Sequence, residues 1–242
     1  MTRILGMDIF NGSREDFYSR LDRSLKAKSA PILIATVNPE ILLLAKRDPS
    51  YKKILDSADL RVCDGIGVKL AALLLGRELC RLTGREILNW LLDQAAKNKY
   101  RLLIVLKKSG LLNQETLNAC LHGKYPELDF GVQTLSPSEK AGGSSAQIVI
   151  TTFGAPEQEM WISANRDSFT NSSILIGVGG ALDVLCGSLP NPPAKLSKFG
   201  LEWLWRVVIQ PKRWRRIVNA VLVFPIVFTI NVISNKLRYE KN

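Results

Sequence analysis

The sequence predicts an α/β fold in which a Rossmann-like, mostly parallel sheet is covered by helices and followed by a C-terminal helical appendage. Short apolar runs recur between segments with a helical pattern. The runs do not alternate with polar residues, which is typical of strands buried on both faces. The composition changes abruptly after residue 193. With 242 residues, the chain is long enough to form one sizeable core.

Five runs rich in β-branched residues and leucine are predicted as strands. They are Pro31–Thr36, Leu60–Cys63, Arg101–Leu106, Gln147–Thr152 and Ile174–Val178. The polar, glycine-containing segment Ser136–Ser145 is predicted as a surface loop or flexible crossover.

Two helix starts are marked clearly. Thr83 and Glu86 form a capping-box pattern that opens a helix running to about Asn98. Asn38 followed by Pro39 opens another, because proline is favoured at the first helical position. The alternation of strands and helices predicts a doubly wound sheet.

The positive charge of the chain is concentrated at its C-terminal end. The net charge is +11 overall, but residues 1–193 carry only +3 (23 Lys and Arg against 20 Asp and Glu) and residues 194–242 carry +8 (10 against 2). Three prolines within 190–193 favour an extended boundary segment. We therefore expect a nearly neutral α/β body over 1–193 and a basic, membrane-associating appendage over 194–242.

The appendage combines an amphipathic pattern, a basic cluster and an uncharged apolar stretch. Gly200–Arg206 predicts a helix, and Gln210–Arg216 holds basic and aromatic residues. Residues 217–233 follow without any charge, but this stretch is shorter than the ~20 residues that span a bilayer core. Shallow insertion into an anionic membrane surface is favoured. A full span and a soluble core or dimer helix, with a possible homo-oligomer, remain alternatives.

Several classes of protein are disfavoured. The four cysteines form no CxxC pair and there is one histidine, so a zinc site and a histidine-dependent hydrolase are not expected. Without a signal peptide, we expect free thiols and a cytoplasmic body. There is no DxD pair, so the sequence does not support a metal-bridged nucleotide-sugar site. The basic cluster adjoins an apolar stretch, which nucleic-acid binding would not explain.

Polar residues that follow the predicted strands are the candidates for the site, because ligands bind at the carboxyl ends of the strands in α/β sheets. Thr36 and Asn38 follow the first strand, and Asp64 follows the second. Asp64 is a candidate general base, with two glycines, Gly65 and Gly67, that leave room for a ligand. The alternative is that Asp64 caps the next helix.

Further candidates follow the later strands. Gly154 and Gln158 come after one, and Gly179, Gly180 and Asp183 come after the last. The glycines could cradle a diphosphate with backbone N–H groups, although their order is not GxGxxG. Gln158 is otherwise an ordinary first-turn residue. Arg81 could bind phosphate, or it could be simply solvated.

Seven motifs appear in an order that points to a known family. They are Thr36–Pro39, Ala58–Val68, Arg81–Gly84, Gly154–Ile162, Gly177–Asp183, Gly200–Arg206 and Gln210–Arg216. Together they resemble the WecG/TagA/CpsF family of bacterial glycosyltransferases, from residue 4 to about residue 217.

The resemblance implies an inverting transferase that moves N-acetylmannosamine or a related hexosyl group from a UDP-sugar. The implied acceptor is N-acetylglucosamine on a polyprenyl diphosphate, in cell-surface polysaccharide or teichoic acid synthesis. The resemblance also implies work at the cytoplasmic face of the cell membrane, as a peripheral protein that needs no metal or other cofactor.

The same resemblance implies roles for single residues. Asp64 matches the catalytic base, and Thr36 and Asn38 match pocket residues near it. Arg81 and Gln158 match substrate-contacting positions. The arginines of an appendage that closes over the site are matched by Arg206, Arg213 and Arg216.

The chain departs from the family pattern at several points. Cys63 and Glu157 stand where proline and lysine are usual, and Asn191–Pro193 replaces a more usual Arg-Ala-Pro. These departures keep a second hypothesis open, a non-catalytic, membrane-bound assembly factor with the same fold. A nicotinamide-dependent oxidoreductase is disfavoured because no glycine motif follows the first strand.

Overall fold

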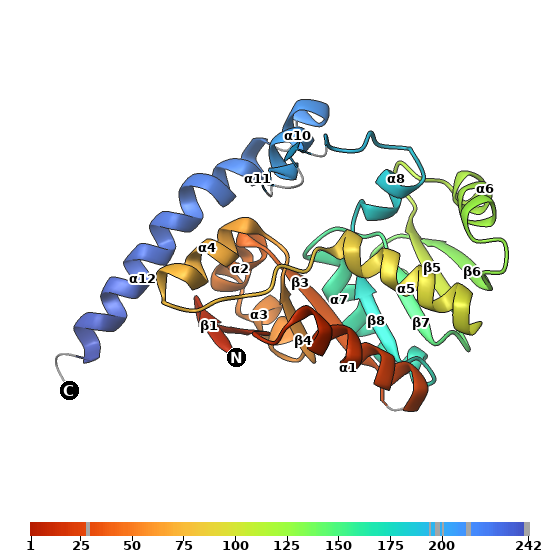
Figure 1. Ribbon diagram of the computed structural model, residues 1–242, viewed down its shortest axis with the longest axis horizontal. Helices are drawn as coiled ribbons and strands as arrows, with labels where there is room; N and C mark the ends of the chain where they lie inside the picture. Colours follow the sequence, from red (N-terminus) through yellow and green to blue (C-terminus); the bar gives the residue numbers. More distant parts are fainter. Residues whose placement is uncertain (28–29, 194, 197–198, 200, 212–213, 240–242) are drawn as a thin grey trace.

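Six parallel strands form the central sheet of the computed structural model (Figure 1), in the order β4-β3-β8-β7-β5-β6. The structure describes residues 1–27, 30–193, 195–196, 199, 201–211 and 214–239. Strand β3 (Ile32–Val37) pairs with β4 (Leu60–Cys63) on one side and with β8 (Ile174–Gly177) on the other. The predicted parallel α/β fold is thus confirmed.

The remaining elements surround this sheet. They are β1 (Thr2–Ile4), β2 (Met7–Ile9), α1 (Arg14–Ala27), α2 (Pro39–Arg47), α3 (Pro49–Asp56), α4 (Ile66–Leu74), α5 (Gly84–Asn98), β5 (Leu102–Lys107), α6 (Gln114–Lys124), β6 (Phe130–Leu135), β7 (Ile148–Thr151), α7 (Glu157–Ala164), the 3-10 turn η1 (Arg166–Phe169), α8 (Ala181–Leu185), α10 (Glu202–Ile209), α11 (Trp214–Val218), the π-helical turn η3 (Asn219–Val223) and α12 (Phe224–Tyr239).

Two hydrophobic cores lie on opposite faces of the sheet. One is shared by α1, α5, α6 and α8, and the other by α2, α3, α4 and α7 together with the β1–β2 hairpin. Successive residues of β3 alternate between them, with Leu33 and Ala35 in one core and Ile34 in the other. Both faces are apolar, so the strands read as continuous hydrophobic runs rather than as alternating ones.

All five predicted strands are present within one or two residues, and two further features were missed. Strand β6 lies at the edge of the sheet and most of its residues are only half-buried, so its sequence lacks the apolar run of the central strands. The β1–β2 hairpin has strands of three residues joined by Leu5 and Gly6, both at positive φ. Strands this short leave no periodicity to recognise.

The two predicted helix starts are confirmed. The side chain of Thr83 accepts a hydrogen bond from the backbone of Glu86 at 3.2 Å, and Glu86 accepts one from the backbone of Thr83 at 2.9 Å. Asn38 Oδ1 accepts from the backbone N–H of Ile41 at 3.0 Å and so caps α2. Each side chain satisfies a donor that a helix N-terminus leaves open.

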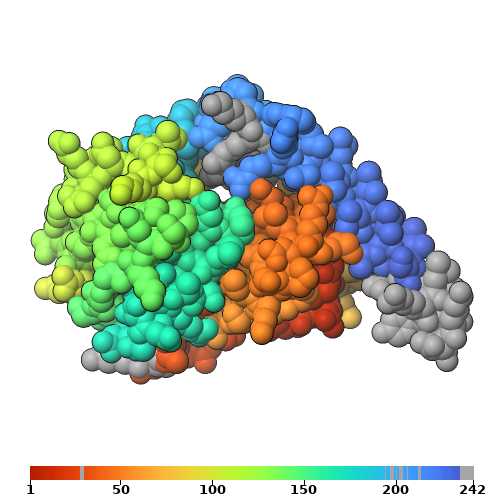
Figure 2. Space-filling model, turned by 180° about the vertical axis from the view of Figure 1, so that it is seen from behind, coloured from red at the N-terminus to blue at the C-terminus, as the bar shows by residue number. Residues whose placement is uncertain are grey.

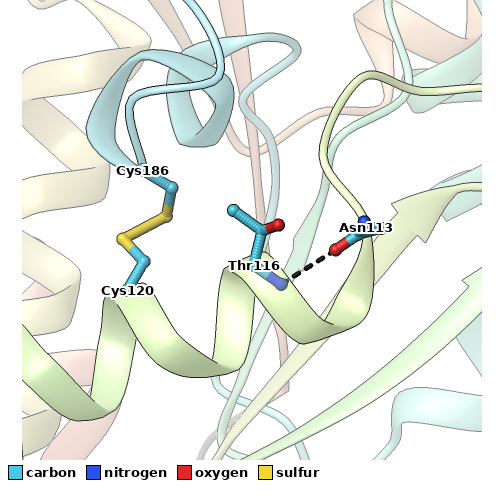
Figure 3. The surroundings of a disulfide bond; sticks show 4 residues. All are labelled: Asn113, Thr116, Cys120 and Cys186. Carbon is cyan, nitrogen blue, oxygen red and sulfur yellow. Dashed lines mark hydrogen bonds between the residues drawn. A yellow bond between two sulfur atoms is a disulfide. The ribbon is translucent and has the colours of Figure 1, made fainter.

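The expectation of four free thiols is wrong for two of them. Cys120 of α6 and Cys186, directly after α8, form a disulfide (Figure 3), while Cys63 and Cys80 are free. The two bonded residues are 66 positions apart, and only the packing of α6 near α8 brings them together. Spacing along the chain carried no sign of this pairing.

The appendage lies against the body along α2 and α4 (Figures 1 and 2). Arg216 Nε donates to Glu40 Oε1 of α2 at 2.6 Å, and Trp205 Nε1 donates to the carbonyl of Pro190 at 3.3 Å. Phe224 and Phe228 of α12 are buried in the core that contains α2 and α4.

The uncharged stretch 217–233 lies within a longer helical segment. Residues Trp214–Ser234 form a 21-residue helix with mean hydropathy 2.2, long and apolar enough by length and composition to cross a membrane. Only 11% of its most apolar window is buried against the body. The helix is therefore longer than the charge pattern alone indicated.

Candidate functional site

The carboxyl ends of β3 and β4 bring Thr36, Asn38 and Asp64 to one edge of the sheet. Parallel pairing sets Val37 opposite Cys63, and the backbone N–H of Asp64 donates to the carbonyl of Val37 at 2.9 Å. Thr36 is buried, whereas Asn38 and Asp64 are half-buried. The sheet register thus places the candidate base beside the two candidate pocket residues.

Asp64 is not the helix cap. The N-cap of α4 is Gly65, which has no side-chain cap hydrogen bond. A Cβ atom at Gly65 would lie 2.7 Å from Pro39 Cδ and 3.4 Å from the Cα of Asn38, so this backbone can approach α2 only as glycine. The capping alternative for Asp64 is therefore wrong.

Arg81 joins the same corner from the segment before α5. It forms a β-bridge with Cys63, and its Nε donates to the carbonyl of Asp64 at 3.1 Å. The carbonyl of Arg81 in turn accepts from Arg14 at 3.1 Å. Arg81 is thus a half-buried cation held next to the candidate base.

Cys63 is enclosed just behind this corner. Burial, with a smaller contribution from the negative charge of Asp64, raises the pKa of the Cys63 thiol to about 12. Nucleophilic cysteines need a lowered pKa, so Cys63 is a packing residue.

Gln158 approaches the site from the other half of the sheet. It lies in the first turn of α7, as expected, but it is only 4% exposed. Its Nε2 donates to Glu159 Oε1 at 2.6 Å, whereas its Oε1 is buried and has no hydrogen-bond partner within the described part of the chain. A buried acceptor without a partner is costly unless a ligand supplies the donor.

Glu159 and Tyr51 hold the amide of Gln158 in this orientation. Tyr51 Oη donates to Glu159 Oε2 at 2.9 Å. Burial raises the pKa of the Glu159 carboxyl and also that of the Tyr51 hydroxyl. Tyr51 was not among the sequence candidates, and its pairing with Glu159 was not foreseen, because 108 positions separate the two residues along the chain.

Glycines bring the two halves of the edge together. The Cβ position of Gly84 lies 3.7 Å from Thr36 Cγ2 and 4.0 Å from the Cα of Val178. A Cβ at Gly177 would lie 2.4 Å from Gln158 Cδ, so only glycine admits the buried amide there. Gly179 adopts φ +51, in the left-handed region.

The remaining candidates of this half lie close by. Gly154 contributes its carbonyl, which accepts from the backbone N–H of Gln158 at 3.0 Å. A Cβ at Gly180 would lie 2.9 Å from Asp183 Oδ2, which places that carboxylate over the glycine turn.

One of the three appendage arginines is located. Arg216 forms an ion pair with Glu40, which is two residues after Asn38. The ion pair therefore holds Arg216 at the start of α2, near the carboxyl edge of the sheet. Arg213 and the side chain of Arg206 fall outside what the structure describes.

A cavity of about 870 Å³ is lined in part by Arg81. Its lining includes Arg14, Ile66, Lys69 and Phe199, but not Asp64 or Gln158. Among the described residues, no group of three or more His, Cys, Asp or Glu side chains is placed to hold a metal ion.

Comparisons with known proteins identify the family of the chain. Residues 2–242 match the glycosyl transferase WecG/TagA/CpsF family. A Bacillus spizizenii protein named N-acetylglucosaminyldiphosphoundecaprenol N-acetyl-beta-D-mannosaminyltransferase is 28% identical over 88% of this chain and 85% of its own length. Proteins of the same name from Bacillus subtilis and Staphylococcus aureus are 28% and 25% identical, over 86% and 98% of this chain and 84% and 95% of their own lengths.

Enlarging Gly177 tests the packing of Gln158. We expect Gly177→Ala to lower the free energy of unfolding by about 1–3 kcal/mol, because the added methyl group meets a buried amide that has no room to move. The matched control is Gly123→Ala in α6, where no atom lies within 4 Å of the new Cβ. Urea denaturation measures both, and equal stability of the two variants would contradict the packing.

The buried Glu159 predicts a pH dependence of stability. Its raised native pKa means that, above the unfolded pKa, the native state keeps a proton that the unfolded chain has lost. Stability contributed by this group therefore falls as pH rises through that window. Relative to Glu159→Gln, the wild type should lose stability as pH rises above the ordinary pKa of a glutamic acid, about 4.

Urea denaturation at a series of pH values measures this difference. Glu115→Gln, on the exposed side of α6, is the control and should leave the wild-type profile unchanged. A stability difference between wild type and Glu159→Gln that stays constant with pH would refute the assignment.

Proposed function

Because the chain belongs to the glycosyl transferase WecG/TagA/CpsF family, we propose that it transfers N-acetylmannosamine or a related hexosyl group from a UDP-sugar to N-acetylglucosamine on a polyprenyl diphosphate. The observation that carries this proposal is the placement of Asp64 and Arg81 together at the carboxyl edge of the sheet. The named relatives transfer N-acetylmannosamine to a diphosphoundecaprenol-linked N-acetylglucosamine, in agreement with this acceptor class.

Asp64 is proposed as the general base of a single inverting displacement. Its carboxylate takes the proton of the acceptor hydroxyl while that oxygen bonds to the anomeric carbon of the donor. The bond from the anomeric carbon to UDP breaks in the same step and leaves its electron pair on the diphosphate. Attack from the face opposite the leaving group inverts the anomeric configuration.

Arginines are proposed to stabilise the charge that develops on UDP. Arg81 is held by a hydrogen bond to the backbone carbonyl of Asp64. A cation fixed in advance in this way can stabilise the negative charge that develops on the leaving group. Arg216, held at α2 by Glu40, brings a second guanidinium to the rim. The family pattern adds Arg206 and Arg213. This arrangement supports a reaction that needs no metal or other cofactor.

Substrate contacts are proposed around the same edge. The open Oε1 of Gln158 fits a hydroxyl or amide N–H of a sugar. Thr36 and Asn38 lie beside Asp64, the proposed general base. The backbone of Gly154, Gly179 and Gly180 and the carboxylate of Asp183 complete the donor side.

The protein is proposed to act as a peripheral protein on the cytoplasmic face of the cell membrane, where the lipid-linked acceptor lies. Arg215 stacks on Trp214 at 5.6 Å, a pairing suited to the anionic headgroup layer. Phe224 and Phe228 tie α12 to the body, so a helix docked in this way lies along the membrane surface rather than across it. The body, residues 1–193, and the appendage, residues 194–242, then have separate tasks.

A donor screen tests the reaction. The protein is incubated with UDP-N-acetylmannosamine, other UDP-hexoses and a short-chain polyprenyl-diphosphate-linked N-acetylglucosamine, and products are read by mass spectrometry. We expect one donor to add a single hexosyl unit. Failure of every donor would favour the assembly factor that keeps the fold without catalysis.

Replacing Asp64 tests its role as the base. We expect Asp64→Asn to lower kcat by at least about 100-fold, since the amide cannot take the proton, while UDP-sugar binding measured by calorimetry is retained. Asp167→Asn, at an exposed position in η1, is the control and should keep full activity. Full activity of Asp64→Asn would rule out this assignment.

Chelation tests the charge-stabilising role of the arginines. We expect EDTA to leave the transfer rate unchanged, because Arg81 and the appendage supply the positive charge. Complete loss of activity that added Mg²⁺ or Mn²⁺ restores would show that the proposal is wrong on this point.

A further inference from the structure

Helix α4 exposes an apolar surface that the fold does not use. Leu70, Leu73, Leu74 and Leu75, here called the α4 leucine face, are between 37% and 79% exposed. Single exposed leucines are ordinary on soluble proteins. Four within six positions at the end of one helix form a contiguous patch, which marks a surface for a partner.

The α4 leucine face adjoins the appendage. The Cβ position of Gly67 lies 3.9 Å from the ring of Phe224 in α12. Leu70 and Leu74 follow Gly67 by three and seven positions, which puts them on the same side of α4. Figure 1 shows α4 running beside α12.

The helical segment formed by η3 and α12 has an exposed apolar side of its own. Leu222 of η3 and Ile226, Ile230 and Ile233 of α12 are each more than half exposed and recur at spacings of four, four and three. They lie opposite the buried Phe224 and Phe228. The exposed apolar side of this segment therefore faces away from the body, while its other side packs against α4 through Phe224.

We propose that the α4 leucine face is a second membrane contact, through which the catalytic body itself inserts into the lipid surface beside α12. The inference rests on the proposed function for its lipid-linked acceptor. Charge favours lipid as the occupant. The last 49 residues, which include α12 beside α4, carry +8, which attracts anionic headgroups. The same charge repels a second copy docked through this segment.

Insertion of the α4 leucine face into lipid would place the 870 Å³ cavity beside Arg81 at the depth of the lipid headgroups. Ile66 lines the cavity together with Arg81, and it shares one side of α4 with Leu70 and Leu73, four and seven positions later. A helix of this length is about 13 Å long. An acceptor could therefore keep its polyprenyl chain in the lipid layer while its diphosphate reaches the cavity.

Vesicle binding of the full chain tests the proposal. The variant carries Leu70→Gln, Leu73→Gln and Leu74→Gln, and the vesicles hold phosphatidylethanolamine and phosphatidylglycerol at about 7:3. We expect the partition coefficient in a flotation assay to fall at least about ten-fold, because three apolar side chains no longer enter the lipid. The control, Leu111→Gln with Met160→Gln, removes exposed apolar residues elsewhere on the body and should bind within two-fold of wild type.

A fluorescent variant locates the contact directly. Leu74→Trp should shift its emission to shorter wavelength on addition of vesicles and should be quenched by lipids brominated on the acyl chain. Leu111→Trp, compared under the same conditions, should show neither effect. Because these measurements need neither donor nor acceptor, they stand even if the proposed reaction fails.

Three results would overturn the proposal. The triple variant could bind vesicles as well as wild type does, or Leu74→Trp could show no shift. Alternatively, light scattering could show a dimer that the triple variant abolishes while vesicle binding is unchanged, which would assign the face to a second copy.

Discussion

The pairing of β3 with β4 on one side and β8 on the other is the constraint on which the rest of the structure depends. Parallel strands send every chain segment out of the sheet at the same edge, so residues far apart in sequence meet there. Asp64 arrives from β4 and Gln158 from the segment after β7, while Thr36 lies between them at the end of β3. A register shift of one residue in β3 would turn Thr36 to the opposite face and open this edge.

Glu159 is buried at an energetic cost and orients the side chain of Gln158. Its carboxyl is almost fully buried, and burial raises its pKa despite hydrogen bonds from Tyr51 and Gln158. Burial of such a group is unfavourable in itself. Glu159 accepts a hydrogen bond from Nε2 of Gln158, which leaves the acceptor Oε1 of the same amide open to a ligand. The polarity of the candidate ligand contact is thereby set by a residue that the ligand need not touch.

The appendage is held to the body by both charge and apolar surface. Arg216 is held by Glu40 of α2, and two phenylalanines of α12 enter the core of the body, which leaves the opposite side of the helix exposed. The exposed side is apolar and the neighbouring chain is basic, a combination that suits a lipid surface carrying anionic headgroups. The proposed membrane contact of the α4 leucine face would extend this surface to the body.

The sequence by itself determined the class of fold, the central strands and both capped helix starts, because buried strands and N-caps leave local patterns. It also singled out Asp64, Arg81 and Gln158 as candidates, through motifs. Only the tertiary structure decided that Asp64 is not a cap and that Cys120 pairs with Cys186. The partnership of Tyr51 with Glu159 and the junction of α4 with α12 likewise depend on contacts between distant segments. Such contacts arise from packing, and no spacing along the chain encodes them.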